Sequence, residues 1–191
     1  INLIKEKDGE ILESRSLTPK GLDVSDISIA IDKNDKVWVA WSDKVGKNKD
    51  IYAMTLDNDK QSEVFRITED PGPDIHPVVA TSEGKVILAW QGFRGASYDI
   101  LYTDLTQMPA HKGNVLASTG NNEWSPAIAA DSKGNFAIPW DAYENSNYDV
   151  FYSVIDKNGQ IKGKHVLAGT RDYEVRPSIV FDNDDRLWVA Y

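Results

Sequence analysis

The sequence predicts an all-β protein built from one unit that repeats about every fifty residues, and three observations support this prediction. An apolar run recurs at residues 27–30, 77–80, 126–129 and 177–180, and Pro77, Pro126 and Pro177 open the last three. A large aromatic residue follows each run, at Trp41, Trp90, Trp140 and Tyr191. An Asp followed by apolar and aromatic residues then recurs at Asp50, Asp99 and Asp149. Self-similarity at a fixed period indicates one repeated supersecondary unit.

The third repeat shows how each unit is expected to fold. Residues 127–130 form an apolar run that is short and bounded by turn residues, which favours a strand over a helix. A turn at 131–134 leads to a second strand at 136–140, and the polar segment 141–147 is expected to be a loop. A third strand at 148–155, an Asn-Gly turn at 156–159 and a fourth strand at 161–167 follow. Turn signals about every ten residues, without helical periodicity, are typical of all-β folds.

Four strands in a unit of this length predict the four-stranded antiparallel blades of a β-propeller. A β-sandwich or a simple meander would also be all-β, but neither requires residue-level repetition. Residues 1–17 align with residues 151–167, so the pattern begins and ends within a unit. We therefore expect one propeller domain or propeller fragment of about four repeats over residues 1–191, with a half blade at 1–18, blades at 19–68, 69–119 and 120–170, and a half blade at 171–191.

The two half blades leave three arrangements open. They could pair with each other and close one ring, as propellers do to hide sheet edges. The chain could also be part of a longer propeller. Two chains could instead share their half blades in a homodimer. A lone open arc would expose sheet edges, which favours a fragment or a shared ring.

The composition excludes several classes of partner. The chain carries 30 Asp and Glu against 21 Lys and Arg, a net charge of -9, so we expect no nucleic-acid partner. No run of eighteen apolar residues is present, so we expect no membrane span. The sequence contains no cysteine, which excludes disulfides, thiolate metal sites and a cysteine nucleophile.

The residues that repeat are interpreted as structural. Trp41, Trp90 and Trp140 are expected to fill the core between adjacent blades rather than to stack on sugars. The aspartates at the start of the third strand are expected to cap turns by accepting backbone N–H groups. Function is therefore expected where the repeats diverge, because a rigid scaffold presents variable loops.

The loops expected on one face are 42–49, 91–98 and 141–148, together with 69–76, 118–125 and 169–176. They mix aromatic, acidic, amide and arginine side chains, which would suit a glycan or a peptide. The ligand-binding candidates in these loops are Arg94, Tyr98, Tyr143, Glu144, His76, Trp124, Tyr173 and Arg176.

An acidic residue lies three positions before each proline, at Asp74, Glu123 and Glu174. These side chains are expected at the entrance of a central channel, where they would be solvated acids or a Ca²⁺ site, since Ca²⁺ prefers oxygen ligands. No other cofactor is expected. A carboxylate pair for glycoside hydrolysis could be drawn from the same three residues. No catalytic residue is assigned, because His76, His111 and His165 occupy unrelated repeat positions.

The motif of Pro77, Gly84, Ala89-Trp90, Arg94-Gly95, Asp99-Ile100 and Tyr102 resembles the TolB-type propeller repeat. That resemblance implies a propeller and an extracytoplasmic location, periplasmic or secreted. The chain departs from the family pattern because turns such as Asp131-Ser-Lys-Gly134 replace its Ser-Pro-Asp-Gly turn. Sialidase-like propellers are more distant relatives, and their Ser-x-Asp-x-Gly-x-x-Trp turn does not occur in this sequence.

We therefore expect a scaffold that binds a glycan or a protein on its loop face, and we favour a role without catalysis. The alternative is the propeller portion of a carbohydrate-active hydrolase, such as a glycosidase or a sialidase-like enzyme. A purely structural array of blades is a third hypothesis. Turnover of a glycan, binding without turnover, and no binding would distinguish the three.

Overall fold

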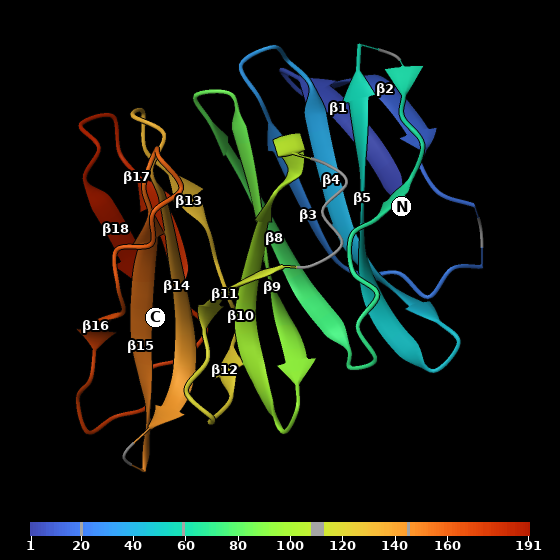
Figure 1. The fold of residues 1–191 in the computed structure, drawn as a ribbon. Coiled ribbons are helices and arrows are strands. Elements are labelled where there is room, and N and C mark those ends of the chain that lie inside the picture. The colour runs from blue at the N-terminus through green and yellow to red at the C-terminus, as the bar shows by residue number, and fades with distance from the viewer. Residues whose placement is uncertain (20, 59, 108–112, 145) are drawn as a thin grey trace.

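The computed structural model describes residues 1–19, 21–58, 60–107, 113–144 and 146–191, and over these residues the chain is almost entirely β-strand. The strands form five antiparallel sheets, numbered 1 to 5 in chain order (Figure 1). Sheet 1 contains β1 (Asn2–Lys7) and β2 (Glu10–Ser16). Sheet 5 contains β17 (Ser178–Phe181) and β18 (Leu187–Ala190). The three sheets between them have four or five strands each.

Neighbouring strands of the larger sheets follow one another in the chain, with two exceptions. Sheet 2 consists of β3 (Ser25–Ile31), β4 (Val37–Val45), β5 (Asn48–Asp57), β6 (Lys60–Gln61) and β7 (Phe65–Arg66). Sheet 3 consists of β8 (Asp74–Ser82), β9 (Lys85–Arg94), β10 (Ser97–Asp104) and β11 (Asn114–Ala117), with a 3₁₀ turn at Leu105–Gln107 after β10. Sheet 4 consists of β12 (Glu123–Trp124), β13 (Ala129–Ala130), β14 (Phe136–Glu144), β15 (Asn147–Ile155) and β16 (His165–Ala168). The exceptions are that β6 and β7 both pair with β5 and that β12 and β13 both pair with β14.

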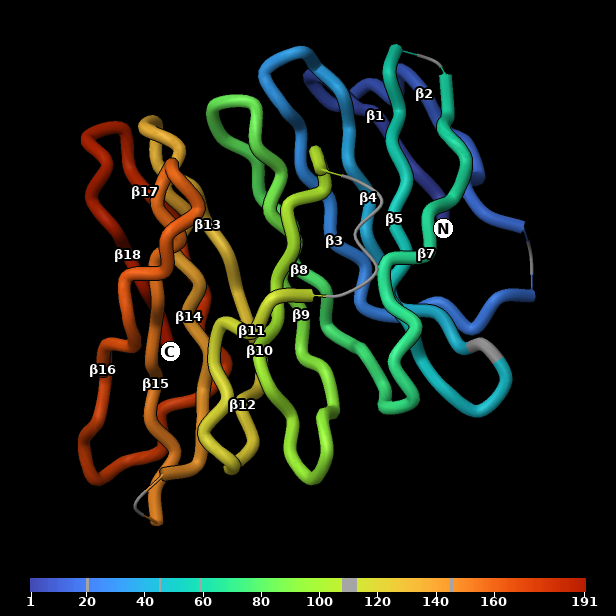
Figure 2. Tube along the Cα trace, in the orientation of Figure 1, coloured from blue at the N-terminus to red at the C-terminus, as the bar shows by residue number. Residues whose placement is uncertain are grey.

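The sheets stand side by side in chain order, from sheet 1 (blue) to sheet 5 (red), as the trace in Figure 2 shows. The first strands of neighbouring sheets contact one another, β3 with β8, β8 with β13 and β13 with β17. Thr81 shows this contact in detail, because its hydroxyl donates a 2.6 Å hydrogen bond to the carbonyl of Ile31. The first strands therefore form the inner side of the arrangement.

The hydrophobic core lies between the sheets in three clusters, one for each pair of neighbours from sheet 1 to sheet 4. Trp41 packs between sheets 1 and 2, Trp90 between sheets 2 and 3, and Trp140 between sheets 3 and 4. These side chains are 1%, 0% and 0% exposed, so the prediction that the repeated tryptophans are core residues is confirmed. Burying a side chain of this size contributes roughly 4–5 kcal/mol of transfer free energy.

The prediction of a loop at 141–147 is wrong. β14 continues to Glu144 and β15 begins at Asn147, and Asp141 pairs with Val150 along the way. Polar side chains do not prevent pairing here, because ladder hydrogen bonds involve only the backbone. The expected fourth strand at 161–167 is shorter than predicted, since Gly163 adopts a φ of 66° and regular pairing begins only at His165.

The aspartates at the start of the third strand do not cap turns through backbone N–H groups as expected. Asp50 accepts a hydrogen bond of 2.6 Å from the Arg66 guanidinium and one of 3.3 Å from the Asn48 amide. Asp149 accepts a bond of 3.4 Å from the amide of Asn147. These carboxylates therefore organise neighbouring side chains rather than the turn backbone.

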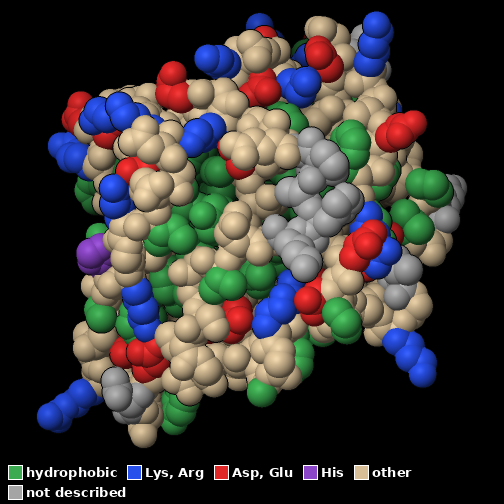
Figure 3. Space-filling view, viewed as in Figure 1, with side chains coloured by type: hydrophobic (Ala, Val, Ile, Leu, Met, Phe, Trp, Pro, Cys, Tyr) green, Lys and Arg blue, Asp and Glu red, His purple; other side chains and the backbone are tan. Residues whose placement is uncertain are grey.

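The face shown in Figure 3 carries Lys and Arg side chains mixed with Asp and Glu side chains, without a continuous basic patch. Apolar side chains show between the sheets on the same face. Within the described residues, no helix has the length and apolar character needed to cross a membrane.

Candidate functional site

One backbone position is strained in the same way in each of sheets 2 to 5. Asp26, His76, Ser125 and Arg176 have φ angles of 53°, 53°, 52° and 54°, in the left-handed region that residues other than glycine rarely adopt. His76, Ser125 and Arg176 each precede a proline. Holding such a conformation costs of order 1–3 kcal/mol at each position, and strain of this kind concentrates at functional sites. We call these four residues the inner ring.

In sheets 2 and 3 the strain has a local cause in the first strand. The pairing register of β3 with β4 shifts between Ser25 and Ser28, and that of β8 with β9 shifts between Ile75 and Val78. Such a bulge turns one side chain out of the regular alternation of the strand. The four side chains of the inner ring consequently line one cavity of about 550 Å³ together with Pro77, Pro126 and Pro177.

Side chains from the preceding sheet hold two members of the inner ring. The Oε1 atom of Gln91 accepts a hydrogen bond of 3.3 Å from the backbone N–H of Ser125. The Oδ1 atom of Asp141 accepts one of 2.9 Å from the backbone N–H of Arg176. Gln91 and Asp141 each follow the core tryptophan of their sheet, so the structural repeat also sets the ring position of the next sheet.

Asp26 and His76 form the third fixed element of the inner ring. Nδ1 of His76 lies 3.1 Å from Oδ1 of Asp26. The hydroxyls of Ser25 and Ser42 donate to Oδ2 of the same carboxylate at 3.1 and 3.0 Å. The carboxylate therefore orients the imidazole and directs its Nε2 atom away from Asp26.

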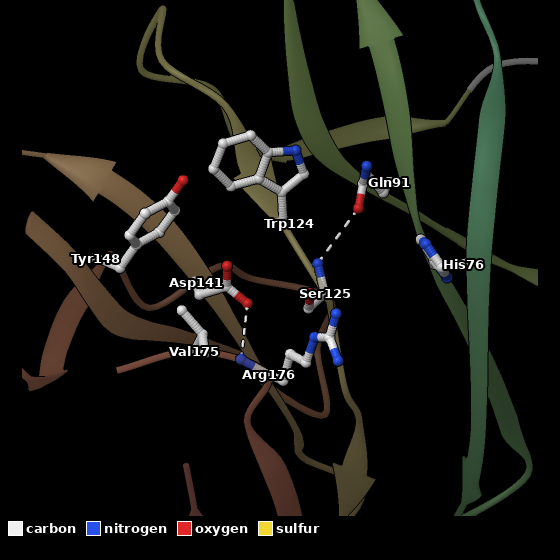
Figure 4. A pocket seen from close by; sticks show the side chains of 8 residues that line it. All are labelled: His76, Gln91, Trp124, Ser125, Asp141, Tyr148, Val175 and Arg176. Atoms are coloured by element: carbon white, nitrogen blue, oxygen red, sulfur yellow. Dashed lines mark hydrogen bonds between the residues drawn. The ribbon is translucent and has the colours of Figure 1, made fainter. Parts of the chain in front are cut away.

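A second cavity of about 480 Å³ adjoins the inner ring (Figure 4), and it is lined by His76, Gln91, Trp124, Ser125, Asp141, Tyr148, Val175 and Arg176. Ser125 and Arg176 lie between the two aromatic side chains and His76 in this view. A third cavity of about 250 Å³ shares Trp124 and Tyr148 with the second. The second cavity thus shares lining residues with both of the others, and we call the three cavities together the loop-face groove.

Four aromatic side chains cluster along the loop-face groove. The ring centroid of Tyr148 lies 5.7 Å from that of Trp124, 5.0 Å from that of Tyr143 and 5.6 Å from that of Tyr173. Tyr143 and Tyr173 remain 43% and 73% exposed. Such rings present both an apolar face and a hydroxyl, and therefore suit a ligand with apolar faces and many hydroxyl groups.

Asp141 is the most buried carboxylate that lines the groove, with 3% of the residue exposed. Burial raises the pKa of Asp141, and the backbone N–H of Arg176 and the Ser125 hydroxyl oppose this effect by hydrogen bonding. The carboxyl group of Asp141 can therefore hold a proton at a higher pH than an ordinary aspartate does.

The structure brings together some of the candidates predicted from the sequence. His76, Trp124 and Arg176 line the second cavity, Tyr143 lines the third, and Tyr173 packs on Tyr148. The remaining three candidates do not line these cavities. They are engaged elsewhere: Arg94 with Asp74 at 2.8 Å, Tyr98 with Phe93 at a centroid distance of 5.2 Å, and Glu144 with Lys164.

The three acids predicted at the channel entrance are buried, Asp74 and Glu123 in strands and Glu174 in the segment before β17. Asp74, Glu123 and Glu174 are 0%, 0% and 4% exposed. Asp74 accepts a 2.8 Å hydrogen bond from Nε1 of Trp90, while Thr119 and Thr170 donate to Glu123 and Glu174. No three His, Asp or Glu side chains group into a metal site in the part of the chain that the structure describes. The calcium site stays a prediction, and these residues lie apart from the loop-face groove.

Sequence reasoning missed Asp26, Gln91 and Tyr148. A signal for Asp26 was available, because it aligns with the residue before each proline at intervals of 50, 49 and 51 positions. Gln91 aligns with Asp141 directly after the core tryptophan. Register, rather than residue type, was the informative property at these positions.

No protein-family model matches the sequence, and a search of curated proteins finds no match either. Solved structures do match. The chain is similar to an α-L-arabinanase of Penicillium chrysogenum complexed with arabinobiose, with a TM-score of 0.66, 11% identity, and coverage of 99% of this chain and 66% of that one. It is similar to an endo-arabinase from Bacteroides thetaiotaomicron, with a TM-score of 0.62, 11% identity, and coverage of 94% and 75%.

TolB from Acinetobacter baumannii is also similar, with a TM-score of 0.51 and 22% identity, and the chain covers 38% of its length while 92% of the chain aligns. These likenesses show that the chain has a β-propeller fold. They do not show the TolB-type repeat family, which stays a resemblance in the sequence. The chain spans between about two-fifths and three-quarters of the length of these three proteins.

Proposed function

We propose that the chain is the propeller portion of a carbohydrate-active protein and that the loop-face groove binds an oligosaccharide. The observation that carries this proposal is the pair of adjoining cavities that share Trp124 and Tyr148, with His76, Gln91 and Arg176 lining the larger of the two. Aromatic rings stack on the apolar faces of sugars, while polar side chains pair with hydroxyl groups.

The structural neighbours support the same class of ligand. Two of the similar structures are arabinanases, and one of them is complexed with arabinobiose. The neighbours thus favour the carbohydrate-active alternative over a scaffold for a protein partner. A periplasmic or secreted location fits this class of protein and stays a prediction.

Replacing Trp124 by Ala tests the proposal. Loss of the indole removes the shared aromatic wall of two cavities, and each stacked ring of this kind is worth about 1–3 kcal/mol, so the dissociation constant should rise about tenfold to a hundredfold. Isothermal titration calorimetry against a panel of neutral and acidic oligosaccharides measures this change.

The matched control is Phe65→Ala, which removes an exposed aromatic side chain from β7, outside the loop-face groove. The control should bind like the unmodified chain. If no oligosaccharide of the panel binds the unmodified chain, or if Trp124→Ala binds as well as it does, the groove is not the carbohydrate site.

Hydrolysis of the bound glycan is the second candidate function, and Asp141 is the observation that favours it. Its raised pKa suits a general acid that protonates the leaving oxygen as the glycosidic bond breaks. We assign the acceptance of a proton from the attacking water to Asp26, which lines the adjoining cavity beside His76. The two carboxyl groups would then exchange one proton each with solvent, so the reaction consumes one water for each bond.

Asp141→Asn separates catalysis from structure. The Asn carbonyl can still accept the hydrogen bond from the backbone N–H of Arg176, so folding and binding should persist while turnover falls at least a hundredfold. Glu174→Gln, which alters a buried carboxyl outside the groove, is the control and should retain turnover. Product analysis by chromatography gives the readout. Equal turnover by Asp141→Asn would remove Asp141 from the mechanism, and no turnover by the unmodified chain would leave only binding.

A further inference from the structure

We propose that the inner end of the loop-face groove recognises a carboxylate on the saccharide, which makes the ligand an acidic sugar chain such as a uronate oligomer. This inference rests on the proposed function and specifies its ligand class. The argument begins with Arg176, whose side chain lines both the inner-ring cavity and the second cavity.

Arg176 differs from most other arginines of the chain in its lack of a partner. Four of the six arginines, Arg15, Arg66, Arg94 and Arg186, pair with a carboxylate of the protein. The Arg176 guanidinium forms no such ion pair and no side-chain hydrogen bond with any residue that the structure describes. A guanidinium carries five N–H donors in a planar fork that fits a carboxylate with two parallel bonds. The cavity therefore presents an unused carboxylate-binding group.

The backbone at Arg176 is fixed before any ligand arrives. Arg176 is in the left-handed conformation, Pro177 restricts the next residue, and Asp141 fixes the Arg176 N–H at 2.9 Å. In Figure 4 the guanidinium extends toward Ser125 and the side of the cavity that His76 occupies.

Further polar groups line the same end of the groove. Nδ1 of His76 donates to Asp26, so Nε2 of the neutral ring is left as an acceptor for a hydroxyl group of the saccharide. The Gln91 amide lines the same cavity, where the Ser125 hydroxyl donates to Asp141. The aromatic wall of Trp124 and Tyr148 continues away from this end, where the following sugar units would lie.

The net negative charge of the chain means that an acidic ligand must find a specific cationic group at the groove. A surface with a net charge of -9 repels anions in general, so an acidic ligand needs a specific cationic group to bind. Asp141 attracts Arg176 electrostatically, but neither Asp26 nor Asp141 forms an ion pair with the Arg176 guanidinium among the described residues: Asp26 is engaged by His76, and Asp141 accepts from the backbone N–H of Arg176 and the hydroxyl of Ser125. Arg176 is the group that can offset this repulsion at the groove.

The test compares each acidic oligosaccharide with its own methyl ester, which has the same sugar units without the negative charge. Calorimetry with oligogalacturonate, oligomannuronate and oligoglucuronate, their methyl esters, and neutral arabino- and xylo-oligosaccharides covers both classes. We expect at least one acidic oligosaccharide to bind about tenfold or more tightly than its ester. Raising the salt concentration should weaken that binding while leaving the ester unaffected.

Arg176→Gln should weaken binding of the acidic oligosaccharide about tenfold to a hundredfold and change binding of the ester little. The matched control is Arg171→Gln, which removes the same charge from an exposed position in the same segment, outside the cavities. Near-ultraviolet circular dichroism verifies the fold of both variants. The carboxylate site is overturned if only neutral oligosaccharides bind, or if an acidic oligosaccharide and its methyl ester bind with equal affinity. The proposed function stands in both cases. Binding of no oligosaccharide at all overturns both.

Discussion

At the scale of single residues, the molecule uses two kinds of carboxylate for two purposes. Asp74, Glu123 and Glu174 are buried, and hydroxyl, indole and guanidinium groups satisfy one oxygen of each. Their second oxygens are buried without a hydrogen-bond partner among the described residues. Asp26 and Asp141, by contrast, line the cavities. A repeated acid three positions before a proline is therefore a structural feature, whereas the acids of the groove occupy other repeat positions.

Glu123 allows a prediction about pH and stability. Burial raises its pKa, the nearby charge of Asp99 adds to this effect, and the Thr119 hydroxyl opposes it. Because the pKa in the folded state lies above that in the unfolded state, this group contributes stability at low pH that is lost as the pH rises through its folded-state pKa. Glu123→Gln keeps an acceptor for Thr119 and removes the ionisation. The unmodified chain should therefore lose stability relative to Glu123→Gln as the pH rises from 4 to 7. The difference in the free energy of unfolding, variant minus unmodified chain, should become more positive over this range.

Urea unfolding at both pH values measures this difference. The control is Glu63→Gln, which removes one negative charge from an exposed position of sheet 2. A difference between Glu123→Gln and the unmodified chain that stays constant or becomes smaller as the pH rises would contradict a raised pKa at Glu123.

The sequence predicted the inner ring only in part, and the reason is conformational. A residue before proline ordinarily prefers an extended conformation, because the proline ring restricts it. His76, Ser125 and Arg176 nevertheless adopt left-handed angles: His76 lies at a bulge of β8, and hydrogen bonds to Gln91 and Asp141 hold the backbone N–H groups of Ser125 and Arg176. That outcome depends on contacts with the preceding sheet, which no local sequence rule contains.

At the scale of elements, the hairpin tips are tied to the next sheet by asparagine side chains. The Asn48 amide donates to the carbonyls of Asp70 and Gly72 at 2.7 and 3.2 Å. The Asn147 amide donates to the carbonyls of Thr170 and Asp172 at 3.0 and 2.8 Å. One side chain therefore fixes the segment that carries Tyr173 and Arg176. The sequence showed the Asp two positions later as a repeat, but the function of the Asn became visible only when the strands proved to extend to the tips.

Asn147→Ala should loosen residues 169–176. Losing two hydrogen bonds of ordinary net strength should lower the free energy of unfolding by about 1–2 kcal/mol. Hydrogen exchange should accelerate in this segment more than elsewhere, and carbohydrate binding should weaken because Tyr173 and Arg176 lose their fixed position. Hydrogen-exchange mass spectrometry of the chain with and without the substitution measures the effect.

The matched control for Asn147 is Asn158→Ala, which alters an exposed turn between β15 and the following segment. It should leave the exchange of residues 169–176 unchanged. Uniform acceleration across all sheets in Asn147→Ala would show a global loss of stability instead of a local tether.

At the scale of the whole molecule, the repeat made the core predictable and left the closure of the propeller open. Each core tryptophan meets the same environment between two sheets, so period and register were sufficient to place it. Sheets 1 and 5 have two strands each and do not pair with one another within the described residues. Ring closure involves contacts between the most distant parts of the chain, and a repeating sequence is equally compatible with closure within one copy or between two.

The surfaces beside the terminal sheets lead to a prediction about self-association. Ile27, Ile29 and Ile31 of β3 are 54%, 52% and 57% exposed, although the opposite face of that strand contacts β8. Ile29 and Ile31 line a cleft of about 620 Å³ between sheets 1 and 2. Val180 and Trp188 of sheet 5 are exposed by 58% and 61%. Exposed apolar surfaces of this kind indicate interaction sites. Sheet 5 of a second copy could pack beside sheet 1, so that its two strands and the two strands of sheet 1 complete one four-stranded blade.

The 191-residue chain should therefore form a dimer in solution, in which each copy covers the Ile29 cleft of the other. Ile29→Ser removes part of the buried apolar area and should weaken the dimer about tenfold or more, because burying such a side chain contributes about 1.5–3 kcal/mol. Val166→Ser, at an exposed position of β16 in sheet 4, removes a comparable apolar side chain away from both surfaces and should leave the dimer unchanged. Sedimentation equilibrium over a range of concentrations measures both. A monomer at every concentration, or equal weakening by the two substitutions, would show that sheets 1 and 5 do not associate between copies.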